Sequence, residues 1–227
     1  MGLRHERGVR SRERGIQLKK MRILGVYKGA IEVLIAANVM VYIFEWAARG
    51  WIFTTLALQP ATVLVKPWTL VTSMFVHADV SHLLFNMISL LFFGLYLERL
   101  LGEREFLNIY FIGGIFASIS YVATSLLFGI PHPNVYGVGA SGAIFAIMGT
   151  LVVLRPNMTI LYSFLFPMPL YVWAILYAVI AVPAMLAPGT VAHNAHLGGL
   201  VAGYVFGKYF QSRVPGEGGR TYGFRFS

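Results

Sequence analysis

The sequence predicts an all-α fold, a polytopic membrane protein whose helices cross the bilayer six times. Only 12% of the 227 residues are charged and 57% are hydrophobic, with a mean hydropathy of +0.69, whereas a soluble domain has about 25% charged residues. Apolar stretches recur along the chain at about the 20-residue length that a transmembrane helix needs. Lys and Arg concentrate between these stretches. One membrane domain is the simplest organisation.

Each expected span is an apolar run bounded by charged residues, Gly or Pro. The six runs are residues 31–46, 82–97, 106–128, 139–154, 167–186 and 193–210. Residues 52–68 are also apolar but contain Pro60 and Pro67. Irregular backbone is not tolerated against lipid tails, so we expect this segment to be an interfacial loop. The expected division is a basic cytoplasmic segment, 1–25, a membrane domain, 26–211, and a flexible cytoplasmic tail, 212–227.

The distribution of positive charge predicts the orientation of the chain. Of the 18 Lys and Arg, 16 lie in the N-terminal segment, the loop after the second span, Arg155 and the tail, and only Arg49 and Lys66 lie opposite. Cytoplasmic loops carry the excess of Lys and Arg, so we expect a multi-pass protein of the cell membrane with both termini in the cytoplasm. A basic chain can bind nucleic acid. Charge confined to loops and tails argues against that partner and for the lipid bilayer.

The chain contains no cysteine, which excludes disulfides, thiolate metal sites and a cysteine nucleophile. His77 and His193 could face a water-filled mouth at the outer end of the spans. Since no acidic or thiol ligand lies near them in the sequence, we expect no metal and no cofactor.

A serine flanked by glycine marks the fourth expected span, in Gly139-Ala140-Ser141-Gly142. Small residues with serine are common packing devices in membrane helices, so this step alone more often indicates a helix contact than catalysis. Ser141 would sit one turn inside the span, on the outer side. His196 lies on the sixth span at the same depth, and a neutral His is the usual base for a serine nucleophile. Without a carboxylate placed to orient His196, we expect a Ser–His dyad.

Small residues give these two spans complementary faces. They lie at helical steps, Gly199, Gly203 and Gly207 on the sixth span and Gly142, Ala146 and Gly149 on the fourth. Such stripes let membrane helices approach closely. Phe145 follows Ser141 by one turn, where its ring could stack on the imidazole of His196. The alternative for His196 alone is a buried structural histidine.

His82 and Asn86 are a second polar pair, on one face of the second span. Both are costly in lipid unless they face a cavity or a partner. The His82 ring N–H, the Asn86 amide and the Ser141 backbone N–H could converge on one developing oxyanion. The alternative is a structural hydrogen-bonded pair between helices.

Taken together, these residues resemble the rhomboid family of intramembrane serine proteases, over roughly residues 31–207. The markers are Trp68-Thr69, His77, His82-Leu83-Leu84-Phe85-Asn86, Leu97-Glu98, Leu101-Gly102, Gly139-Ala140-Ser141-Gly142, Ala195-His196-Leu197-Gly198-Gly199 and Gly203. The combination is specific, although each marker alone is not.

The resemblance implies a six-helix rhomboid-like bundle with Ser141 as nucleophile, His196 as general base, and His82 and Asn86 as oxyanion groups. It also implies that the segment between the first two spans packs sideways in the membrane. Two departures are evident. Many members carry Trp-Arg where this chain has Trp68-Thr69, so any role of that Arg is absent or moved. Many carry Tyr in place of Phe145, which keeps the ring but not the hydroxyl.

The hypothesis is an intramembrane serine endopeptidase that cleaves transmembrane segments of membrane-protein substrates. The alternative is a non-catalytic membrane protein, either a scaffold that binds such segments or a small transporter, whose polar residues line a cavity. Inverted repeats would favour a transporter, but the polar residues cluster on spans two, four and six toward one side. Cleavage of a model substrate separates the two hypotheses.

Overall fold

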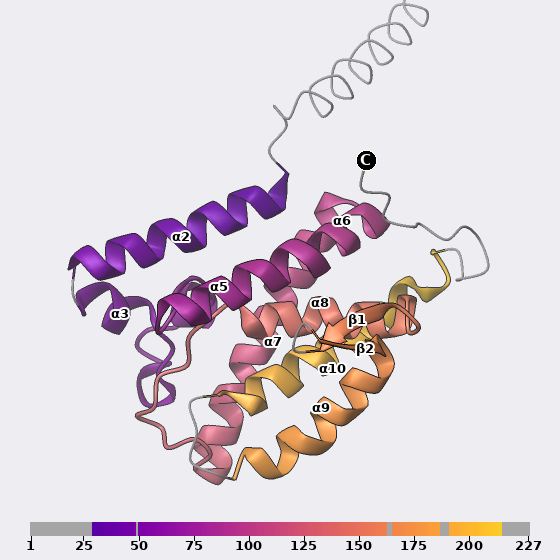
Figure 1. The fold of residues 1–227 in the computed structure, drawn as a ribbon. Coiled ribbons are helices and arrows are strands. Elements are labelled where there is room, and N and C mark those ends of the chain that lie inside the picture. The colour runs from indigo at the N-terminus through magenta and orange to yellow at the C-terminus, as the bar shows by residue number, and fades with distance from the viewer. Residues whose placement is uncertain (1–28, 49, 163–164, 187–190, 215–227) are drawn as a thin grey trace, which may run out of the picture.

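The computed structural model describes residues 29–48, 50–162, 165–186 and 191–214, and nearly all of their regular structure is helical (Figure 1). The α-helices are α2 (Ala30–Ala48), α3 (Trp51–Leu56), α4 (Thr69–Thr72), α5 (Val80–Ser89), α6 (Leu95–Leu101), α7 (Glu103–Phe128), α8 (Ser141–Leu154), α9 (Leu170–Ala184) and α10 (His193–Gln211). The other described elements are the 3-10 helices η1 (Pro60–Thr62) and η2 (Ser73–Phe75), the π-helical η3 (Leu90–Gly94), and the strands β1 (Thr159–Tyr162) and β2 (Phe166–Pro169). The expected segment 1–25 and residues 215–227 of the expected tail lie outside the described residues.

Each of the six expected spans coincides with a helix. Because η3 joins α5 to α6, Val80–Leu101 forms one helix, and it is one of three described helices, with α2 and α7, that are long and apolar enough to cross a membrane. Helices α8 and α9 are shorter but apolar. The prediction of an all-α polytopic membrane fold is therefore confirmed, whereas the count of six crossings stays a prediction.

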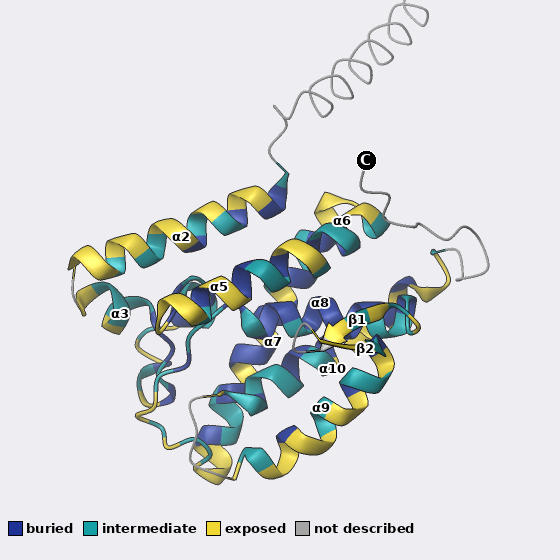
Figure 2. Ribbon diagram, viewed as in Figure 1, coloured by how far each residue is buried: buried dark blue, intermediate teal, exposed yellow. Residues whose placement is uncertain are grey.

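The outward faces of the peripheral helices are apolar rather than polar. Figure 2 shows much of α2 and α9 exposed. The exposed residues include Ile43 and Phe44 on α2, 56% and 55% exposed, and Val179 and Ile180 on α9, 65% and 61% exposed. Soluble monomers rarely expose contiguous apolar patches of this kind. These faces are suited to lipid tails.

Helix α8 lies at the centre of the core, with α10 directly against it. Most of α8 is buried, and the close approach depends on glycine. A Cβ at Gly199 would overlap the carbonyl oxygen of Gly142, and a Cβ at Gly203 would overlap that of Ala146. Thr150 of α8 also donates its hydroxyl to the Gly203 carbonyl at 3.1 Å. The predicted contact between the two small-residue faces is confirmed.

The segment expected to be an interfacial loop, residues 52–68, is made of short helical pieces and irregular backbone. Leu58 and Gly137 exchange backbone hydrogen bonds of 3.1 and 2.7 Å, which ties this segment to the loop before α8. Leu64 is 93% exposed. The irregular backbone is confirmed, and the position of the segment at the membrane interface stays a prediction.

Two helices begin later than expected. Helix α8 begins at Ser141, because Gly139 has a φ of +111°, outside the helical region. The expectation that Ser141 sits one turn inside the helix was therefore wrong. Helix α9 begins at Leu170, because Phe166–Pro169 forms β2 and pairs antiparallel with β1. This hairpin was not predicted. Pro169 disfavours the helical conformation at the residue before it, which keeps that stretch extended.

Candidate active site

Ser141 and His196 are brought together by the contact between α8 and α10. Ser141 is the first residue of α8, and His196 lies in the first turn of α10. The Ser141 Oγ and His196 Nε2 atoms are 2.7 Å apart, within hydrogen-bond distance, although the residues are 55 positions apart in the chain. An imidazole in this position can accept a proton from the hydroxyl.

Phe145 and Gly199 support the imidazole. The Phe145 ring stacks on the His196 ring, with 4.3 Å between centroids and 8° between planes, so the expected stacking is confirmed. Gly199 follows on α10, where a Cβ would lie 3.2 Å from the Phe145 Cβ besides overlapping the Gly142 carbonyl. The absence of a side chain at Gly199 therefore lets α10 bring His196 to Ser141.

The backbone before Ser141 turns at Gly139, whose φ of +111° favours glycine. The Gly139 N–H donates to the Ser73 carbonyl at 2.9 Å. A Cβ on Gly139 would lie 2.7 Å from His82 Nε2 and 3.7 Å from Ser141 Oγ, so the His82 ring and the serine hydroxyl flank the same point. As the first helical residue, Ser141 has a backbone N–H without a partner inside α8. A free N–H at the positive end of a helix is suited to bind a developing anion.

His82 and Asn86 lie one turn apart on α5, as expected. Asn86 is buried and donates one amide N–H to the His82 carbonyl at 2.8 Å. The amide has a second N–H, and its oxygen, Oδ1, is buried without a hydrogen-bond partner among the described residues. The structure thus brings the His82 ring to the backbone beside Ser141, whereas part of the Asn86 amide is engaged within its own helix.

Asp79 determines where the helix that carries His82 begins. Its carboxylate accepts the Ser81 hydroxyl at 2.5 Å and the His82 backbone N–H at 2.8 Å. These two hydrogen bonds, that of the hydroxyl above all, lower the pKa of Asp79 below its ordinary value. Asp79 is therefore an N-cap of α5, and this carboxylate serves the helix that carries His82.

The two histidines expected to face a water-filled mouth lie elsewhere. His77 is fully buried, with its ring edge-on to that of His82 at 5.1 Å between centroids, so the expectation that it faces water was wrong. His193 is half-buried at the start of α10 and contacts the Tyr177 hydroxyl at 3.1 Å. Within the described ranges, no three His, Cys, Asp or Glu side chains gather closely enough to hold a metal ion.

Tyr177 of α9 was missed by the sequence analysis. Its hydroxyl lies 2.8 Å from His196 Nδ1, the ring nitrogen that faces away from Ser141. Tyr177 is one of several aromatic residues in the apolar run of α9. Nothing in its spacing indicates which of them points toward α10.

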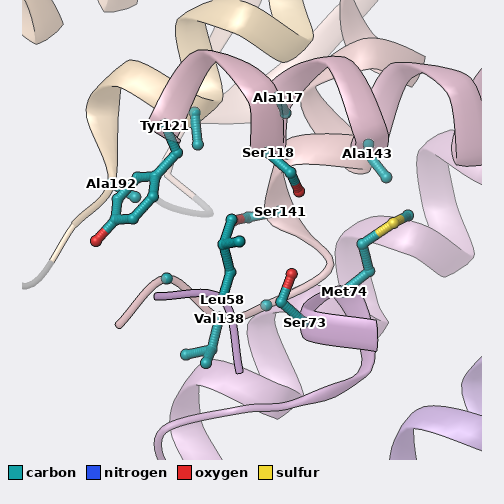
Figure 3. A pocket seen from close by; sticks show the side chains of 15 residues that line it. Leu58, Ser73, Met74, Ala117, Ser118, Tyr121, Val138, Ser141, Ala143 and Ala192 are labelled. Atoms are coloured by element: carbon teal, nitrogen blue, oxygen red, sulfur yellow. The ribbon is translucent and has the colours of Figure 1, made fainter. Parts of the chain in front are cut away.

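A small cavity of about 30 Å³ lies next to Ser141, large enough for a water molecule. Figure 3 shows the side chains of Ser73, Ser118 and Ser141 around it, with Met74 and Tyr121 at its edges. These hydroxyls give the cavity a polar lining within an apolar bundle.

Fold and site together define a helical membrane protein with a serine and a histidine paired inside its bundle. A model of the rhomboid domain matches residues 65–213, which include both. The chain therefore belongs to the rhomboid family, as its resemblance indicated.

Three relatives illustrate the similarity. Rhomboid protein 1, mitochondrial, from Saccharomyces cerevisiae is 32% identical over 198 residues, which cover 82% of this chain and 55% of that protein. Putative rhomboid protease YdcA from Bacillus subtilis is 42% identical over 82 residues, 36% of this chain and 38% of that protein. Rhomboid protease GluP, also from Bacillus subtilis, is 31% identical over 137 residues, 60% of this chain and 25% of that protein. This chain thus spans 55% or less of the length of each.

Proposed function

We propose that this protein is an intramembrane serine endopeptidase that cleaves a peptide bond in or next to a transmembrane segment of a membrane-protein substrate. The observation that carries the proposal is the 2.7 Å contact between Ser141 Oγ and His196 Nε2 in the interior of a membrane bundle. Two relatives that bear the word protease in their names, YdcA and GluP, support the same class of activity. The proposed chemistry uses protein groups and water, and needs no cofactor or metal.

In the proposed reaction, Ser141 Oγ attacks the scissile carbonyl while His196 Nε2 takes its proton. His196 then returns that proton to the leaving amine, and a water molecule hydrolyses the acyl-enzyme with the same imidazole as base. Stacking on Phe145 supports this role, because the imidazole plane stays fixed while its charge changes. The cavity beside Ser141 supports it further, since it offers a polar place for water.

The proposed oxyanion site combines the Ser141 backbone N–H with His82 and Asn86. The approach of the His82 ring to Gly139 supports this assignment, as does the second N–H of Asn86 that its bond to the His82 carbonyl leaves available. Removing one such donor lowers the rate by about 100-fold to 1000-fold in enzymes that stabilise an oxyanion.

The substrate must present an unwound stretch of chain. A helix holds its carbonyls in its own hydrogen bonds, so attack requires that one turn opens locally. Gly, Pro or small polar residues near the outer end of the substrate span make that opening easier. The size of the cavity, about 30 Å³, also favours small residues beside the cleaved bond.

The proposed location is the cell membrane, with both termini in the cytoplasm and Ser141 toward the outer side. The asymmetric distribution of Lys and Arg supports this orientation. The proposed partners are transmembrane substrates and the lipid bilayer, without nucleic acid.

Reconstituted protein tests the proposal against a non-catalytic scaffold or transporter. The substrates are two model transmembrane helices that differ only near their outer end, one with a Gly-Pro pair and one with Leu at both positions. The wild type and Ser120→Ala should cleave the first substrate faster. Ser120 is a matched control because its hydroxyl is bonded to the Phe116 carbonyl of its own helix at 2.9 Å. Ser141→Ala should cleave neither, and binding of both substrates without cleavage by the wild type would favour the scaffold.

A further inference from the structure

The imidazole of His196 has a second partner, on the side away from Ser141. The Tyr177 hydroxyl lies 2.8 Å from His196 Nδ1 and 3.1 Å from His193 Nδ1. The hydroxyl of one tyrosine on α9 thus bridges two histidines in the first turn of α10. Neither contact has a role in the function proposed above.

We propose that Tyr177, with His193 behind it, is a positioning residue that holds His196 in the tautomer with its proton on Nδ1. The proposal rests on the function assigned above, in which Nε2 must carry a lone pair to take the Ser141 proton. A neutral imidazole carries one N–H. When that N–H is on Nδ1 and donates to the Tyr177 oxygen, Nε2 is left unprotonated and faces the serine.

The protons along this chain of groups are consistent in one direction. Ser141 donates to His196 Nε2, His196 Nδ1 donates to Tyr177, and Tyr177 donates its own hydroxyl proton to His193 Nδ1. In the reverse direction, Tyr177 would donate to His196 Nδ1 and leave the proton on Nε2, where it would face Ser141 with no lone pair. His193 selects the productive direction, because its Nδ1 accepts the tyrosine proton.

Tyr177 is held in place by its ring. The ring lies against Phe145, with centroids 4.6 Å apart, and stacks on Trp173 at 5.5 Å and 21°. Phe145 itself stacks on His196. The hydroxyl is therefore fixed relative to the imidazole by aromatic contacts that do not involve its oxygen, and Tyr177→Phe removes the hydrogen bonds while the ring contacts remain.

The test compares Tyr177→Phe with the wild type in two readouts. The first is steady-state cleavage of the Gly-Pro substrate, where we expect kcat to fall by about fivefold to tenfold, the net value of a hydrogen bond, with KM unchanged. The second is ¹⁵N NMR of histidine-labelled protein, in which His196 is assigned by its absence from His196→Ala. In the wild type Nδ1 should be the protonated nitrogen and Nε2 the unprotonated one, and Tyr177→Phe should shift the balance toward the other tautomer.

Tyr171→Phe is the matched control, because Tyr171 lies on the same helix, is 41% exposed and should change neither readout. A Tyr177→Phe protein with unchanged kcat and tautomer overturns the proposal, as does a raised KM with unchanged kcat, which would assign Tyr177 to substrate contact. A wild type that neither cleaves substrate nor acylates Ser141 overturns the proposed function and this proposal with it. The two failures are distinguishable because only the second affects the wild type.

Discussion

Gly139→Ala is expected to inactivate the protein by crowding His82 rather than by unfolding it. A Cβ at position 139 would lie 2.7 Å from His82 Nε2 and 2.8 Å from Cε1, whereas an ordinary contact begins at 3.4 Å. The imidazole must therefore retreat by about 0.7 Å from the backbone beside Ser141. If His82 is an oxyanion donor, this displacement should cost much of the roughly 100-fold to 1000-fold that one donor contributes to the rate.

The same substitution also strains the backbone, because φ at Gly139 is +111° and a side chain at positive φ costs about 1–2 kcal/mol. Gly102→Ala separates the two effects. Gly102 has a φ of +91°, but a Cβ added there would have no neighbouring atom within 4 Å, so this variant carries strain without crowding. Both variants should unfold at a lower temperature in detergent, and only Gly139→Ala should lose activity.

The assay is the rate at which a fluorophosphonate acylates Ser141, measured beside thermal unfolding of the same samples. The reasoning would be refuted if Gly139→Ala lost only stability, to the same extent as Gly102→Ala, and acylated at the wild-type rate. In that case the approach of His82 to Gly139 would be packing, and His82 would not contribute to the oxyanion site.

Further substitutions test other parts of the site and the topology. Asn86→Ala should lower substrate cleavage by about 100-fold or more with an unchanged circular dichroism spectrum, and full activity would remove Asn86 from the oxyanion site. Phe145→Leu should slow acylation by about fivefold to tenfold, because an aromatic pair contributes about 0.5–1.5 kcal/mol, and an unchanged rate would show that stacking does not hold His196. Since the chain has no cysteine, an impermeant maleimide should label Arg155→Cys and Lys66→Cys from opposite sides of oriented vesicles, and labelling from the same side would contradict the proposed orientation.

Apolar runs and glycine spacing predicted much of the fold. The apolar runs are long enough to locate each helix, and four-residue steps from Gly199 to Gly203 indicated where α10 meets α8. The start of α8 was less accessible. Gly139 lies in an apolar, helix-like sequence, and only its positive φ, a property of the folded loop, moves the helix start to Ser141.

The hairpin and the surroundings of the candidate site could not be predicted in the same way. Residues 159–169 are mostly apolar and show no alternation that would mark strands. Tyr177 lies in a helix that is apolar on all sides, so the sequence carries no moment to indicate its inward face. The burial of His77 likewise depends on how the segment before α5 packs. These features arise from tertiary packing, which spacing along one chain does not contain.

The central claim, an activated serine inside the bundle, is tested most directly by the intact mass of detergent-solubilised protein after treatment with a fluorophosphonate. The account predicts one adduct on the wild type and none on Ser141→Ala or His196→Ala, because Ser141 is the nucleophile and His196 its base. Folded wild-type protein that remains unmodified, or a His196→Ala variant that is modified as fast as the wild type, would contradict it.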